Sequence, residues 1–227
     1  MAGFFLTGIA GNAIAKQQLF EAYKRVIAID PGHGGDESGA VGPDSASEKA
    51  VVLNLAQILA AELQREYKVV LTRSDDSTLD LDQRTALANH HQADLFISIH
   101  TGGSFVHSTS GMSIYHYQDF SETPPPQKPD KNAPILWDQA QSRHLAKSRE
   151  LAGLINTRLG GLEAVEGSRI QGAPLLLLQA ANMPAVLIEI GCLTNPAEEK
   201  KLSDQHFLAD LAREIRRAID EYFEQAQ

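Results

Sequence analysis

The chain alternates between short apolar runs, which are typical of buried strands, and longer stretches whose apolar residues recur every three or four positions, as on one face of a helix. Strand-like runs lie at residues 26–30, 67–72, 95–99, 111–117, 175–178 and 185–190. Helix-like stretches lie at residues 50–66, 81–91, 139–159 and 207–223. This alternation predicts a single α/β domain with a mixed, mostly parallel sheet and helices on both faces.

The length of 227 residues fits one domain with an appendage. We expect the domain to span residues 25–227 and to contain a variable, irregular insert at about residues 118–137, where proline is frequent. Residues 1–24 are expected to be an N-terminal leftover. They contain a short apolar stretch but lack the positively charged start of a signal peptide.

Charge and hydropathy exclude several classes of partner. The formal net charge is −9 and the isoelectric point is about 5.3. Binding to the phosphates of a nucleic acid requires clustered Lys and Arg, so no nucleic-acid partner is expected. No apolar run is long enough to span a bilayer, so no membrane insertion is expected. Cys192 is the only cysteine, which leaves no intramolecular disulfide and is typical of a small buried apolar residue.

Four polar residues lie where an α/β fold gathers its functional groups, at the carboxyl ends of strands. His33 follows the first strand in DPGHGG, and Glu48 begins the helix after that glycine-rich loop. His100 ends the third strand in SIH, and Glu189 lies near the end of the last strand in LIEIG. We therefore expect these side chains to meet at one edge of the sheet.

The residue types suit a catalytic zinc site. Two imidazoles and a carboxylate can hold zinc with a fourth position left for water, whose pKa zinc lowers to about 7. A second carboxylate, here Glu189, could take the proton of that water and pass it to a leaving nitrogen. Other roles stay open, because a loop histidine is often only hydrogen-bonded and Glu48 could simply complement a helix dipole. Glu189 in an apolar strand favours function, since an unpaired buried carboxylate is costly.

Other catalytic motifs are missing. Gly32 and Gly34 begin a GxGxxG pattern, but Glu37 stands where the third glycine is needed. The sequence contains no GxxxxGK[ST] phosphate loop, no GxSxG nucleophile elbow and no HExxH zinc motif. The spacing of the residues alone therefore does not decide whether the chain has a metal site.

Five segments, taken together and in order, resemble the Amidase_3 family of N-acetylmuramoyl-L-alanine amidases. They are VIAIDPGHGGDESGAVG, SEKAVVLNLA, VVLTRSDD with LDQRTALAN, ADLFISIHTGG, and MPAVLIEIGCLTNPAEEKKL. The resemblance implies a six-stranded mixed sheet, a single zinc ion held by His33, Glu48 and His100, and Glu189 as the catalytic carboxylate. It also implies hydrolysis of the amide between the lactoyl group of N-acetylmuramic acid and L-alanine of the peptidoglycan stem.

The resemblance carries expectations about place and partners as well. Peptidoglycan as the substrate implies action in the periplasm or outside the cell. No separate wall-binding module is visible, so a protein activator or targeting partner is expected. Some members of the family carry an inhibitory helix between the third strand and the following long helix, here residues 105–143. The Pro-rich residues 123–134 disfavour a helix in the first part of this segment, so no autoinhibition is expected.

The sequence departs from the family pattern at Thr101, Gly102 and Gly103, where Ala or Asp followed by Asn is usual. This change lies beside the expected zinc site and affects the surface that would face the substrate. Two other functions stay open: a non-catalytic peptidoglycan-binding regulator on the same fold, and a zinc amidohydrolase acting on another amide, such as a soluble muropeptide.

Overall fold

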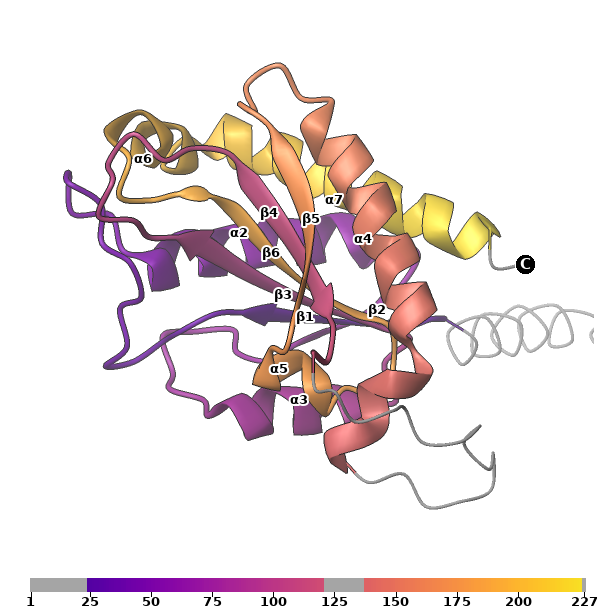
Figure 1. The fold of residues 1–227 in the computed structure, drawn as a ribbon. Coiled ribbons are helices and arrows are strands. Elements are labelled where there is room, and N and C mark those ends of the chain that lie inside the picture. The colour runs from indigo at the N-terminus through magenta and orange to yellow at the C-terminus, as the bar shows by residue number, and fades with distance from the viewer. Residues whose placement is uncertain (1–23, 121–136, 226–227) are drawn as a thin grey trace, which may run out of the picture.

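The computed structural model describes residues 24–120 and 137–225, which form an α/β unit around one six-stranded sheet (Figure 1). The strands are β1 (Val26–Pro31), β2 (Lys68–Leu71), β3 (Leu95–Gly102), β4 (Met112–Tyr117), β5 (Ser168–Ala173) and β6 (Ala185–Cys192). Their spatial order is β2-β1-β3-β6-β4-β5. The first four strands in this order are mutually parallel, whereas β4 runs antiparallel to β6 and parallel to β5. The predicted mixed, mostly parallel sheet is confirmed.

Helices cover both faces of the sheet (Figure 1). They are α2 (Glu48–Leu63), α3 (Leu81–His90), the 3₁₀ helix η1 (Trp137–Arg143), α4 (Leu145–Gly160), α5 (Leu176–Gln179), α6 (Pro196–Leu202) and α7 (Gln205–Gln225). Helices α2, α4 and α7 lie on one face, while α3 and α5 lie on the other. Within the described parts of the chain, no helix is long and apolar enough to cross a bilayer.

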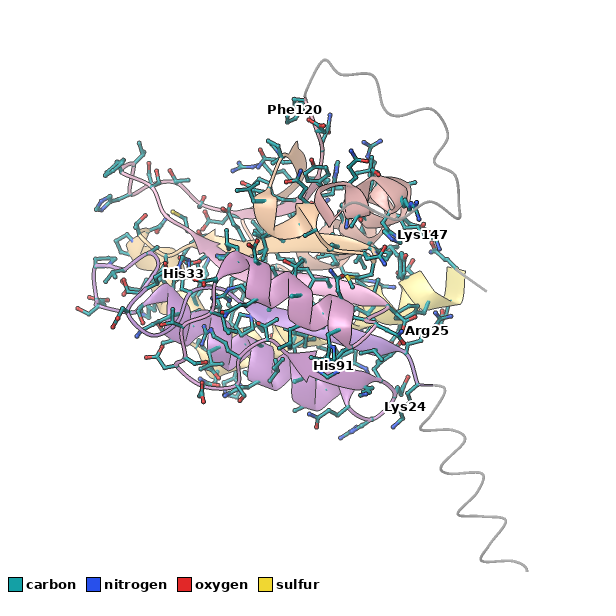
Figure 2. All side chains as sticks on the ribbon, turned by 90° about the horizontal axis from the view of Figure 1, so that it is seen from below. Lys24, Arg25, His33, His91, Phe120 and Lys147 are labelled. Atoms are coloured by element: carbon teal, nitrogen blue, oxygen red, sulfur yellow. The ribbon has the colours of Figure 1, made fainter. Side chains whose placement is uncertain are left out.

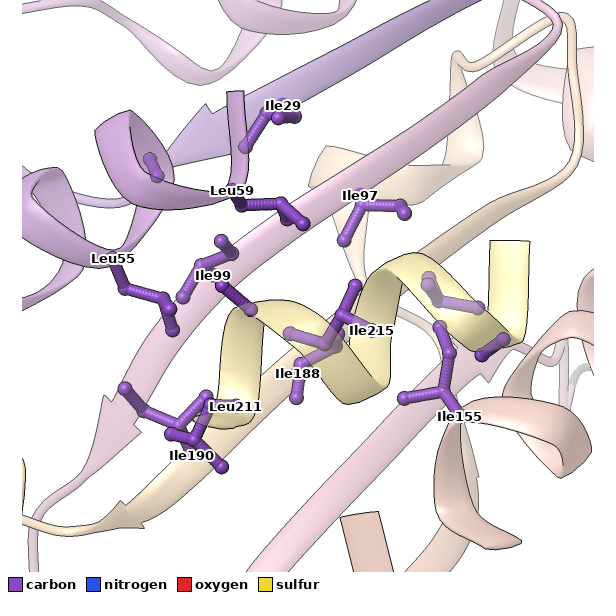
Figure 3. Close-up of a cluster of buried hydrophobic side chains, with 14 of the residues drawn as sticks. Ile29, Leu55, Leu59, Ile97, Ile99, Ile155, Ile188, Ile190, Leu211 and Ile215 are labelled. Carbon is purple, nitrogen blue, oxygen red and sulfur yellow. The ribbon is translucent and has the colours of Figure 1, made fainter. Parts of the chain in front are cut away.

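The larger core lies between the sheet and helices α2, α4 and α7 (Figure 3). Alternate residues of β1, β3 and β6 point into it, because successive side chains of a strand face opposite ways. Ile97 and Ile188 are fully buried there, and so are Leu59, Leu211 and Ile215 from the helices. Burial of each such side chain contributes about 1.5–3 kcal/mol to the stability of the fold. This core therefore holds the sheet against helices α2, α4 and α7.

The smaller core lies under α3 and α5 and covers only part of the opposite face. Its members include Ala28, Phe96 and Ala185, which lie at or near the amino ends of β1, β3 and β6. Toward the carboxyl ends of the same strands this face instead carries polar side chains, among them His100 and Glu189. The second helical layer therefore leaves the predicted site uncovered.

The strand predicted at residues 175–178 is wrong. These leucines lead into the short helix α5, in which Leu177 and Leu178 are buried and Leu176 is exposed. The strand lies earlier, at Ser168–Ala173, where only residues of partial or full exposure occur. A short apolar run has no period that separates strand from helix, and an edge strand need not be apolar. The apolar run at residues 175–178 was therefore taken for the strand, and the more polar strand at Ser168–Ala173 was not predicted.

Smaller differences concern the ends of elements. The helix predicted at residues 139–159 is divided into η1 and α4, and α6 was not predicted. The third strand extends to Gly102, three residues beyond its predicted end. Residues 1–23 and 121–136 lie outside the described residues. They include almost all of the predicted N-terminal extension and of the predicted insert. They also include the Pro-rich segment on which the argument against an inhibitory helix depends.

Candidate metal centre and adjacent carboxylate

The structure brings His33, Glu48 and His100 together at the carboxyl ends of the parallel strands. His33 lies in the loop after β1, Glu48 is the first residue of α2, and His100 lies near the end of β3. Figure 2 shows His33 at the end of the molecule opposite to Arg25, where β1 begins. The parallel arrangement of β1 and β3 thus gathers residues that lie far apart in the sequence.

One potential ligand atom from each of these residues lies within 4.8 Å of the other two. Oε1 of Glu48 is 3.2 Å from Nε2 of His33 and 3.0 Å from Nδ1 of His100. The two imidazole rings meet edge to face, with centroids 5.1 Å apart. The histidine side chains are 27% and 21% exposed, so the cluster is accessible from solvent.

Glu48 is the buried member of the cluster and is held by backbone groups on two sides. Its Oε2 accepts a hydrogen bond from the Ala40 N–H at 2.9 Å, and its Oε1 accepts one from the Thr101 N–H at 2.9 Å. Burial alone would raise the pKa of Glu48, but the bonds from His100, His33 and these two amides together lower the pKa well below its usual range. The carboxylate is therefore ionised, as a metal ligand must be.

Two glycines make room for the cluster. A Cβ at Gly32 would collide with the His100 imidazole, and a Cβ at Gly39 would lie 2.5 Å from Oε2 of Glu48. His33 itself has φ of 58°, a left-handed conformation that is uncommon for a residue with a side chain. The loop is thus shaped around the three side chains.

A buried ion pair supports this loop from below. Asp30, fully buried at the end of β1, accepts bonds from Arg84 of α3 (2.9 Å), Thr72 (2.6 Å) and Ser98 (2.7 Å). Arg84 also donates to the carbonyl of His33 at 2.8 Å. The position of His33 therefore depends on an ionic network that joins β1, β3 and α3.

Glu189 lies on the same sheet face, beside the cluster. It is paired in register with His100 on one side and with Ser113 on the other. Its Oε2 accepts a hydrogen bond from the Tyr115 hydroxyl at 3.1 Å, and Gln171 donates to the same hydroxyl at 3.3 Å. Burial raises the pKa of Glu189, partly opposed by the bond from Tyr115 and by the charge of His100. A carboxyl group with a raised pKa is suited to proton transfer near neutral pH.

The donor set fits a zinc ion. Two imidazole nitrogens and one carboxylate oxygen are a common arrangement for catalytic zinc, with one position left open. Glu189 is not a member of this cluster, and its role as the catalytic carboxylate stays a prediction. All four residues predicted from the sequence therefore lie at one end of the sheet.

Sequence reasoning missed the residues that hold these four in place. Tyr115 lies on β4 and Gln171 on β5. The sequence indicates only that side chains alternate between the two faces of a strand, and the register that brings these two residues beside Glu189 was unknown. Asp30 and Arg84 could have been noticed, because a carboxylate inside the apolar run VIAID needs a buried partner. Which arginine supplies it could not be read from spacing.

The departure at Thr101 and Gly102 leaves the cluster intact. The Thr101 amide donates to Glu48, and Gly102 pairs with Cys192 after an irregularity in the register of β3 and β6. Both roles involve the backbone, so the side-chain change does not remove a contact to the cluster. Cys192 is buried, as expected, and its thiol contacts Thr194.

Comparison with known proteins agrees with the resemblance seen in the sequence. Residues 27–221 match the model of the Amidase_3 family, N-acetylmuramoyl-L-alanine amidase. The N-acetylmuramoyl-L-alanine amidase AmiC of Neisseria meningitidis serogroup B is 32% identical over 217 residues, which cover 87% of this chain and 52% of the relative. The chain thus spans about half the length of this curated relative.

Solved structures show the same fold. The catalytic domain of CwlV, an N-acetylmuramoyl-L-alanine amidase from Bacillus (Paenibacillus) polymyxa var. colistinus, superposes with a TM-score of 0.71 at 30% identity, covering 88% of this chain and 98% of that one. The CwlD amidase of Clostridioides difficile, solved in complex with the GerS lipoprotein, gives a TM-score of 0.69 at 25% identity, covering 88% and 98%.

Proposed function

The chain belongs to the Amidase_3 family of N-acetylmuramoyl-L-alanine amidases, and from this membership we propose that it is a zinc-dependent hydrolase of peptidoglycan. The bond cleaved is the amide between the lactoyl group of N-acetylmuramic acid and L-alanine of the stem peptide. The observation that carries the proposal is the juxtaposition of two kinds of group: a His33–Glu48–His100 cluster with the donors of a zinc site, and Glu189 in register beside His100.

Each of the four residues has a distinct task in this proposal. His33, Glu48 and His100 would hold the zinc ion, which when bound supplies a Lewis acid for the scissile carbonyl and lowers the pKa of the attacking water. The ionised Glu189 carboxylate accepts a proton from that water. It then donates the proton to the nitrogen of L-alanine as the C–N bond breaks, and so returns to its ionised state.

We expect purified peptidoglycan digested by this protein to release stem peptides that begin with L-alanine. Release should stop after treatment with a zinc chelator and return when zinc is added, because water without the metal is a poor nucleophile at neutral pH. Mass spectrometry of the soluble products measures both the cleavage site and its metal dependence. Cleavage that persists in the metal-free protein would contradict the zinc mechanism.

The same digestion separates the alternatives. A regulator that only binds peptidoglycan would retain zinc yet release no peptide. An enzyme for soluble muropeptides would cleave small fragments but leave the intact polymer undigested.

Replacing Tyr115 with phenylalanine is expected to move the acidic limb of the pH profile of kcat/KM toward higher pH, by up to about one unit. The Tyr115 hydroxyl donates to Glu189 and stabilises its ionised form, so its loss raises a pKa that burial has already raised. The proton-accepting form then appears only at higher pH. Tyr67→Phe is the matched control, because the Tyr67 hydroxyl bonds to Asp220 on a different part of the surface. An unmoved acidic limb in Tyr115→Phe would show that Glu189 does not set it.

The proposal extends to the organisation of the chain and its surroundings. Residues 25–227 form the catalytic domain, with residues 1–24 as an extension and about 118–137 as an insert. The substrate places its action in the periplasm or outside the cell. A protein activator or targeting partner is also proposed, since a structural neighbour was solved together with a lipoprotein.

A further inference from the structure

Four residues form one lateral row across the open face of the sheet. His100 on β3 is in register with Glu189 on β6, Glu189 with Ser113 on β4, and Ser113 with Arg169 on β5. Residues paired in register on neighbouring strands point to the same face. Arg169 therefore points to the face that carries the metal cluster and Glu189.

Arg169 differs from the other arginines near the site. Arg73 and Arg84 are almost fully buried, and their guanidinium groups donate to backbone carbonyls of the loop that contains His33. Arg169 is exposed, and with the described residues it makes no hydrogen bond and no ion pair. It therefore does not hold the fold together as the other two do.

The charges around Arg169 leave it available to an anion. Within the described residues, no carboxylate forms an ion pair or hydrogen bond with Arg169. Glu189 receives its hydrogen bond from Tyr115, and the positive charge of Arg169 acts on Glu189 only through space, where it helps to lower the pKa of that carboxyl group. A planar guanidinium without a protein partner is well shaped to bind a carboxylate through two parallel bonds.

The spacing of the row fits the substrate of the proposed reaction. Neighbouring strands lie about 4.8 Å apart, so Arg169 is about two spacings, or about 10 Å along the row, from Glu189. An extended peptide advances about 3.3–3.6 Å per residue. A carboxylate on the residue after L-alanine is then within reach of the long Arg169 side chain when the L-alanine nitrogen lies at Glu189.

We propose that Arg169 is a specificity-determining residue that binds a free carboxylate on the peptide side of the scissile amide, on the residue that follows L-alanine. This inference rests on the proposed function, and it adds the group of the substrate that the enzyme recognises, a carboxylate of the stem peptide. It makes the enzyme selective for acidic stems over stems whose carboxyl group is amidated.

The test uses two synthetic N-acetylmuramoyl tripeptides of the sequence L-alanyl-γ-D-glutamyl-L-lysine amide. They are identical except that the α-carboxyl group of the glutamyl residue is free in one and a carboxamide in the other. Zinc-loaded wild-type protein is expected to cleave the free acid with a kcat/KM about 10- to 100-fold higher, the range of a charge-assisted hydrogen bond. Both substrates are compared at a pH above the acidic limb of the profile, because the charge of Arg169 also lowers the pKa of Glu189. There, Arg169→Gln should lose that factor on the acid, mainly through KM, and change little on the carboxamide.

Arg149→Gln is the matched control. Arg149 is also exposed and without a hydrogen bond among the described residues, but it lies on α4, which packs on the opposite face of the sheet. This variant should keep the wild-type preference for the acid. As a second measurement, calorimetric titration of the zinc-loaded Glu189→Gln variant, with and without Arg169→Gln, should show the same ratio in Kd.

Each outcome has a distinct meaning. Equal losses on both substrates in Arg169→Gln would overturn the inference, because Arg169 would then act through Glu189 or the fold. Equal cleavage of both substrates by the wild type would overturn it as well and leave the amidase function standing. Cleavage of neither substrate, and of no peptidoglycan, would instead contradict the proposed function.

Discussion

A Glu189→Gln variant is expected to retain zinc but to hydrolyse peptidoglycan with a kcat lower by about 10²–10⁴-fold, the usual contribution of a positioned acid–base group. The amide side chain is nearly isosteric and can still contact the Tyr115 hydroxyl, yet it cannot accept a proton from water. Metal analysis of the purified variant and the rate of stem-peptide release from purified peptidoglycan give the two readouts.

The comparison with a ligand variant separates chemistry from metal binding. His100→Ala should lose both zinc and activity, since His100 belongs to the cluster and Glu189 does not. If Glu189→Gln kept full activity with zinc bound, the proton would have to be moved by another group, and the role assigned to Glu189 would be wrong.

An Asp30→Ala variant is expected to lower the free energy of unfolding by about 3–5 kcal/mol, the usual effect of removing one member of a buried ion pair. Arg84 would keep its bonds to backbone carbonyls but lose the carboxylate that neutralises it. Thr72 and Ser98 would lose the acceptor they share. Urea unfolding followed by circular dichroism measures the change.

The surface pair of Arg213 and Asp210 provides the matched control. Asp210 is 48% exposed on its side chain and pairs with Arg213 at 2.7 Å. Asp210→Ala should cost less than about 1 kcal/mol, because exposed ion pairs contribute little. If Asp30→Ala lost no more free energy of unfolding than Asp210→Ala, the buried network under His33 would not stabilise the fold as expected.

The sequence was most informative where chemistry and pattern coincide. His33, His100 and Glu189 each lie in or directly after a strongly apolar run, and the carboxyl ends of parallel strands must meet at one edge. Glu48 could be added because it begins the next helix. The α/β architecture followed from the alternation of strand-like and helix-like stretches along the chain. That alternation is still recognised when the predicted ends of the elements are wrong by a few residues.

The rest depended on contacts that no local pattern encodes. The leucines at 175–178 could form either a strand or a helix, and only the pairing of β5 with β4 decides between them. The same pairing places Gln171 and Arg169 beside Tyr115 and Ser113. Register is set by the whole sheet, because a shift of one residue would turn every side chain to the other face. These residues could not be assigned before the strand order was known.

The position of β6 has a consequence for the time at which activity arises. Of the strands in the described residues, β6 is the last along the chain, yet it lies between β3 and β4 in the sheet (Figure 1). A chain synthesised only as far as β5 would contain the three proposed ligands but neither Glu189 nor the strand that joins the two halves of the sheet. Synthesis must therefore pass residue 192 before the ligands and the proton acceptor can occupy one site. Under the proposed mechanism, the growing polypeptide is inert toward the cell wall until β6 has been inserted into the sheet.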